Sequence, residues 1–166
     1  MHYQAVVGVL GGGQLGRMLA LAGYPLGLHF LFVDPAADAP AGQVAELVVA
    51  PWDDEPALAR LAQTTVVTYE FESVPEHAAR RLEGRVPIHP PPAALAVAQD
   101  RLAEKLTFQA LGIPTPAFFP VNERADLDRA LAELGMPVVL KTRRQGYDGK
   151  GHSPKTRSPE DCSCQA

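Results

Sequence analysis

The chain has 166 residues, of which 46% are hydrophobic and 20% are charged, and its net charge at pH 7 is −4. This composition is typical of a water-soluble globular protein, and the lack of a basic run interleaved with aromatic residues argues against nucleic-acid binding. The apolar stretches are shorter than the roughly 20 residues that span a bilayer, and the N-terminus lacks the pattern of a signal peptide, so we expect a cytoplasmic protein.

The first half of the chain alternates short apolar runs with helical patterns, which is typical of an α/β fold with a parallel sheet. We predict helices from Gln14 onward and over residues 53–63 and 75–84, and strands over residues 5–10, 28–34, 45–50, 65–72 and 86–90. The first helix carries an apolar stripe formed by Leu15, Met18, Leu19, Leu21 and Ala22. Residues 1–92 are therefore predicted to form a Rossmann-like domain.

The run His89-Pro90-Pro91-Pro92 marks the boundary of this domain, because successive prolines continue neither a helix nor a strand ladder. A long helix over residues 93–112 is predicted next, followed by a strand at 117–121, a helix at 126–135 and a strand at 137–141. We interpret residues 93–152 as a linker helix and an incomplete second domain, and residues 153–166 as a disordered or frameshifted tail.

Gly11, Gly13 and Gly16 fit the pattern G-x-G-x-x-G between the first strand and the first helix. Such a loop brings backbone N–H groups and the positive end of a helix dipole to a phosphate. Asp34, at the end of the second strand, stands where an NAD-binding fold places its ribose carboxylate. Because a proline follows it, Asp34 could instead only cap a turn. NAD(P), another phosphate ligand and a structural turn all stay open.

Glu70 and Glu72 end the fourth predicted strand, at the edge where open parallel sheets bind ligands. Two carboxylates there suit the recognition of hydroxyl or amino groups. The alternative is that the alternation Tyr-Glu-Phe-Glu merely places both glutamates on a solvated face.

A second candidate site is the run VVLKTRRQGYDGKG, from Val138 to Gly151. Lys141 at a strand exit, followed by a charged glycine loop, suits a polyphosphate, although the loop is no Walker A motif and could be a solvated turn. Asp100, Arg101 and Lys105 form a third group. Arg101 and Lys105 are like-charged residues one helical turn apart, a pair that does not stabilise an isolated helix, so the pair suggests an anionic ligand or a distant carboxylate as its partner. A solvated helix face is the alternative.

Together, the runs GVLGGGQLGRML, VVTYEFESVP, AQDRLAEK and PVVLKTRRQGYDGKG resemble the ATP-grasp ligases of purine biosynthesis. Among these, the chain is most similar to the N5-carboxyaminoimidazole ribonucleotide synthetase family, and the resemblance covers Val7 to about Asp161. It implies a Rossmann-like pre-ATP-grasp domain followed by the start of an ATP-grasp domain. The implied reaction consumes aminoimidazole ribonucleotide, bicarbonate and ATP, and it yields the N5-carbamate, ADP and phosphate.

The resemblance also implies two sets of binding residues. The glycine loop would hold the 5′-phosphate side of the ribonucleotide, and Glu70 would read its ribose or amine; the substrate-binding set is Gly11, Gly12, Gly13, Gln14, Leu15, Glu70 and Glu72. The set implied for ATP is Arg101, Lys141, Gly146, Tyr147, Asp148, Gly149, Lys150, Gly151 and His152. No catalytic residue is assigned, and no metal ligand is predicted in this chain.

The family's chain continues for about another domain, which is expected to supply the Mg²⁺ ligands. We therefore expect this chain to have little or no turnover by itself, and the full-length family to form homodimers. Two other functions stay open: an NAD(P)-linked oxidoreductase, and a non-catalytic interaction module that exposes an apolar patch.

Overall fold

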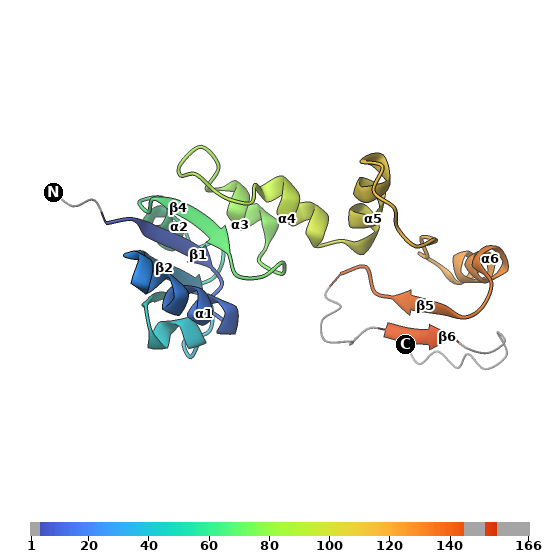
Figure 1. The fold of residues 1–166 in the computed structure, drawn as a ribbon, viewed down its shortest axis with the longest axis horizontal. Coiled ribbons are helices and arrows are strands. Elements are labelled where there is room, and N and C mark those ends of the chain that lie inside the picture. The colour runs from blue at the N-terminus through green and yellow to red at the C-terminus, as the bar shows by residue number, and fades with distance from the viewer. Residues whose placement is uncertain (1–3, 145–151, 156–166) are drawn as a thin grey trace. The chain divides into compact units, whose positions relative to one another are not determined.

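The computed structural model describes residues 4–144 and 152–155. The chain divides into two compact units, Met1–Ala96 and Val97–Ala166, and each has a sheet of its own (Figure 1). Predictions that concern residues 145–151 and 156–166 lie outside the described residues.

The first unit is built on a parallel sheet whose strands lie in the order β3-β2-β1-β4. The strands are β1 (Val6–Leu10), β2 (His29–Asp34), β3 (Glu46–Val49) and β4 (Val66–Tyr69). The predicted α/β fold with a parallel sheet is therefore confirmed. The fifth predicted strand, at residues 86–90, is reduced to a single parallel bridge between Val67 and Ile88.

Both faces of this sheet are covered, as the near-continuous apolar strands require. Successive residues of β2 alternate between two clusters: Leu31 and Val33 join one, and Phe30 and Phe32 join the other. The first cluster includes apolar residues of α2 (Glu55–Leu61) and α3 (Glu76–Arg80), and the second includes a residue of α1 (Gln14–Gly23). The helix predicted at 53–63 is confirmed, whereas the one predicted at 75–84 is shorter than expected. Two short 3-10 helices, Tyr24–Leu26 and Pro40–Gln43, complete the unit.

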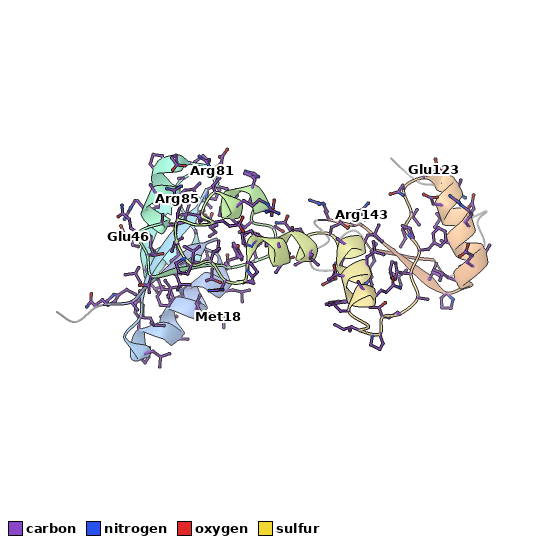
Figure 2. The ribbon with its side chains drawn as sticks, turned by 90° about the horizontal axis from the view of Figure 1, so that it is seen from above. Met18, Glu46, Arg81, Arg85, Glu123 and Arg143 are labelled. Carbon is purple, nitrogen blue, oxygen red and sulfur yellow. The ribbon has the colours of Figure 1, made fainter. Side chains whose placement is uncertain are left out.

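The face that α1 turns to the sheet differs from its apolar stripe. Gly16, Ala20 and Gly23 are the buried residues of the helix, whereas Leu15, Met18, Leu19 and Leu21 are 41–61% exposed. A Cβ atom at Gly16 would lie 2.9 Å from the Phe32 ring, and one at Gly23 would lie 2.4 Å from the Phe30 ring. The bulky rings of β2 therefore leave room only for small residues on the facing side of α1. The large apolar residues of α1 face outward, among them Met18, which is labelled in Figure 2.

The second unit contains α5 (Arg101–Ala110), α6 (Arg124–Leu134) and an antiparallel pair of strands, β5 (Val138–Lys141) and β6 (His152–Lys155). The helix and strand predicted at 126–135 and 137–141 are present. Residues 117–121, predicted as a strand, form no regular element. Residues 153–155, placed in the tail by sequence, pair with β5 in β6.

The single long helix predicted over residues 93–112 is wrong. The structure has two helices there, α4 (Pro92–Ala98) and α5, with Gln99 and Asp100 between them. Asp100 adopts an extended conformation, with φ −127° and ψ 111°, and its side chain caps α5. The apolar pattern runs through this break, and an Asp at an N-cap is the signal that would have found it.

Among residues 4–144 and 152–155, none of the helices is long and apolar enough to cross a membrane.

Candidate functional site

The glycine loop and Glu70 meet at the carboxyl edge of the parallel sheet. Because β1 and β4 are neighbours with Leu10 opposite Tyr69, the chain leaves both strands at the same level. The Glu70 N–H donates to the Leu10 carbonyl at 2.9 Å and so extends this pairing by one residue. Glu70 thereby lies beside the turn that leads from β1 into α1.

The Glu70 carboxylate accepts three backbone hydrogen bonds from this turn. Its Oε2 accepts from the Gly13 N–H at 2.8 Å, and its Oε1 accepts from the N–H groups of Leu15 and Gly16 at 3.0 and 3.3 Å. These donors belong to the first turn of α1, where backbone N–H groups have no partner within the helix. The carboxylate satisfies these donors and complements the positive end of the helix dipole.

Asp34 supplies a second carboxylate to the same turn. Its Oδ2 accepts from the Gly12 N–H at 2.8 Å, and its Oδ1 accepts from the Ala36 N–H at 2.8 Å. Asp34 therefore caps the turn that follows β2 and also holds the glycine loop. The bond to Gly12 could not be read from the sequence, because Gly12 is 22 residues away.

The remaining residues of the predicted substrate set lie around this edge. Gln14 and Leu15 are exposed at the start of α1, and Glu72 is exposed beyond the end of β4. The predicted strand extends to Glu72, but β4 ends at Tyr69, so the alternation that would place Glu70 and Glu72 on one strand face is absent. The structure brings Glu70 to the glycine loop.

In the second unit, Asp100 joins the start of α5 to the segment that follows β5. It accepts from the Leu102 and Ala103 N–H groups at 2.9 and 3.2 Å, and it pairs with the Arg143 guanidinium through contacts of 2.7 and 3.1 Å. The Arg144 Nε lies 3.4 Å from the same carboxylate. Asp100 is 5% exposed, and the hydrogen bonds from Arg143 and the backbone lower its pKa to about 2.

This junction organises two residues of the predicted ATP set. Arg101 is the first residue of α5, and its N–H donates to the Arg143 carbonyl at 2.9 Å. Lys141 is exposed at the end of β5, two residues before Arg143, which is labelled in Figure 2. His152 begins β6 opposite Lys141. Residues 146–151 of that set lie outside the described residues.

Lys105 has a partner that the sequence pattern did not indicate. Its Nζ lies 5.8 Å from the centre of the Phe118 ring, within the range of a cation–π contact. This contact links α5 to the irregular segment after it and gives the lysine a role without an anionic ligand.

Two family matches define the class of protein to which the chain belongs. Residues 4–99 match the ribonucleotide synthetase preATP-grasp domain family, and residues 106–164 match the ATP-grasp domain family. The first unit is thus a pre-ATP-grasp domain, and the start of an ATP-grasp domain follows it.

The relatives identify the family. The N5-carboxyaminoimidazole ribonucleotide synthase of Pseudomonas aeruginosa is 52% identical over 156 residues, which are 93% of this chain and 43% of that protein. The crystal structure of the synthetase from Thermus thermophilus superimposes with a TM-score of 0.82 at 59% identity, over 93% of this chain and 41% of the other. The chain belongs to the N5-carboxyaminoimidazole ribonucleotide synthase family.

A fungal member of the family has been solved with its ligands. The Aspergillus clavatus enzyme, in complex with ADP and 5-aminoimidazole ribonucleotide, has a TM-score of 0.81 at 31% identity, over 95% of this chain and 42% of the other. The chain corresponds to the N-terminal portion of these relatives and spans less than half of their length. Membership favours a ribonucleotide synthetase over the NAD(P)-linked oxidoreductase that the glycine pattern left open.

Proposed function

We propose that this chain is the N-terminal portion of an ATP-dependent carboxylase that joins bicarbonate to the amino group of 5-aminoimidazole ribonucleotide. The products are N5-carboxyaminoimidazole ribonucleotide, ADP and phosphate. The observation that carries the proposal is the meeting of the glycine loop with Glu70 at the edge where open α/β sheets bind ligands. The ligands named for the Aspergillus clavatus relative support it.

The ribonucleotide site of this proposal lies in the first unit, along the carboxyl edge of its sheet. The loop residues, with Gln14 and Leu15 exposed beside them, form one wall, and Glu70 and Glu72 bring carboxylates to accept hydrogen bonds from amino or hydroxyl groups. These roles rest on the position of the residues at the sheet edge.

The adenine nucleotide of this proposal binds the second unit. Arg101 and Lys141 bring positive charge to the two ends of the Asp100–Arg143 junction, where charge-assisted hydrogen bonds to phosphate oxygens would form. The glycine-rich residues 146–151 and His152 complete the proposed set. When bound, Mg²⁺ neutralises phosphate charge; the described residues contain no group of three or more His, Cys, Asp or Glu side chains that could hold it, so we assign it no ligand here.

We further propose that this chain binds ligand but does not complete the reaction alone, because the relatives carry more than half of their length beyond the matched region. The assay is ADP release by the purified 166-residue chain with ATP, bicarbonate and 5-aminoimidazole ribonucleotide. We expect no release above the rate without ribonucleotide, and turnover at an ordinary enzymatic rate would overturn this part of the proposal. A cytoplasmic location and homodimers of the full-length enzyme belong to the same proposal.

NADH fluorescence tests the alternative ligand of the glycine loop. The proposal predicts no saturable change when the chain is titrated with NADH. Tight, saturable binding would instead favour a dinucleotide site with Asp34 at the ribose.

A further inference from the structure

The N–H groups at the start of α1 are already held by carboxylates of the chain itself. Asp34 accepts from Gly12, and Glu70 accepts from Gly13, Leu15 and Gly16. A phosphate bound by a G-x-G-x-x-G loop uses these same backbone donors and the same end of the helix dipole. In this chain, a phosphate there would have to displace Glu70 and would meet the negative charge of Asp34.

The glycines of the loop are fitted to the Glu70 side chain. A Cβ atom at Gly13 would lie 2.4 Å from Glu70 Oε1, and one at Gly11 would lie 2.8 Å from Glu70 Cβ. Gly11 also has a φ of +102°, which side-chain-bearing residues rarely adopt. The glycine spacing that elsewhere lets the backbone approach a pyrophosphate here lets it approach a carboxylate 57 residues further along the chain.

We propose that Glu70 occupies the anion position of the glycine loop, and that it thereby excludes phosphate from this position. The loop has the glycine spacing of a phosphate-binding loop, but the anion at its amides is a carboxylate of the chain itself. This goes beyond the proposed function; where it bears on that function, it directs the phosphate of the ribonucleotide away from the loop amides. The side of the ribonucleotide that reaches this edge is then one that offers hydrogen-bond donors to the carboxylates.

The test is chemical rescue of the emptied position. The midpoint of thermal unfolding is measured for the wild-type chain, Glu70→Ala and the control Glu83→Ala, an exposed glutamate on the same unit, in sodium formate, sodium phosphate and sodium chloride of equal ionic strength. We expect a lower midpoint for Glu70→Ala, and a saturable increase of several degrees in formate or phosphate beyond that in chloride. Wild type and Glu83→Ala should show no such increase. A merely structural glutamate would give destabilisation without anion-specific recovery.

Backbone amide NMR of the wild-type chain provides a second test that needs no variant. During titration with inorganic phosphate, the resonances of Gly13, Leu15 and Gly16 should not move beyond the chloride control. Saturable shifts at these amides, or an equal phosphate-specific stabilisation of wild type, would overturn the proposal. Neither measurement uses the ribonucleotide, so the inference can fail while the proposed function stands, and the reverse also holds.

Discussion

Two acidic residues, Glu70 and Asp100, act in the same way in the two units. Each accepts backbone hydrogen bonds at the start of a helix and ties that helix to a segment more than 40 residues away in the chain. Glu70 ties α1 to the end of β4, 57 residues later in the chain. Asp100 ties α5 to the arginine pair after β5.

Gly13→Ala should lower the free energy of unfolding by about 1–2 kcal/mol, the typical cost of losing a helix cap. The new methyl group would displace the Glu70 carboxylate, which lies at the end of a flexible side chain, so lost hydrogen bonds rather than backbone strain cause the effect. Urea unfolding of Gly13→Ala, Glu70→Ala and the double variant measures it. The alanine at residue 13 should cost clearly less when Glu70 is already removed, and additive effects would contradict the coupling.

The substitution Asp100→Asn should lower the free energy of unfolding near neutral pH. In acid, wild type and variant should become equally stable, because Asp100 is then protonated in the wild type. Since the folded-state pKa is about 2 and the ordinary value is 3.8, the stabilisation is present above about pH 4 and is lost as the pH falls toward 2. Asparagine is as good a helix cap as aspartate, so this variant isolates the pair with Arg143.

The urea midpoints of wild type and Asp100→Asn, compared between about pH 6 and about pH 2.5, test this expectation. The gap between the two proteins should be constant down to about pH 4 and then narrow. A gap that widens in acid would contradict the assigned role.

The sequence predicts the strand that leads to Glu70, although β4 ends at Tyr69 rather than at Glu72, and it does not predict the partners of Glu70. The carboxyl ends of parallel strands lie at one edge of the sheet, so the sequence predicts the edge at which Glu70 lies. The contact of Glu70 with Gly13, 57 residues away, depends on which strands are adjacent. For the same reason, Asp34 was readable as a turn cap, and its bond to Gly12 was not.

At the scale of elements, α1 shows why an apolar stripe does not by itself identify the buried face of a helix. The period of the stripe predicts the helix, but Phe30 and Phe32 on β2 leave room only for Gly16, Ala20 and Gly23. Ring size on a neighbouring strand is tertiary information, which the helix sequence does not contain.

Substitutions on the two faces of α1 should therefore differ sharply. Met18→Ser, on the exposed face, should change the free energy of unfolding by no more than about 0.5 kcal/mol, whereas Ala20→Leu should lower it by about 1–3 kcal/mol through overpacking against β2. Chemical denaturation measures both. If Met18→Ser were the more damaging of the two, the exposed stripe would be buried in solution, for example by self-association.

The break between α4 and α5 and the irregular residues 117–121 are two places where the structure differs from the predicted elements. Apolar periodicity is continuous across Gln99 and Asp100, so only the capping role of Asp100 marks the end of one helix and the start of the next. In the second case, Phe118 lies beneath Lys105 rather than in a strand ladder.

At the scale of the whole molecule, the division after Ala96 separates the four-stranded parallel sheet from the start of a second domain. The first unit has covered faces and two apolar clusters, so a chain of residues 1–96 should unfold in one cooperative transition. Circular dichroism of that fragment during heating measures this. A broad, gradual melt would show that the first unit depends on the residues after it.

Calorimetric titration of the 166-residue chain with 5-aminoimidazole ribonucleotide tests the central claim most directly, namely that the carboxyl edge of the first sheet is the ribonucleotide site. We predict saturable binding to one site, retained in Glu83→Ala, weakened at least tenfold in Glu70→Gln and unaffected by NADH. The absence of binding by the folded chain, or full affinity in folded Glu70→Gln, would contradict the account.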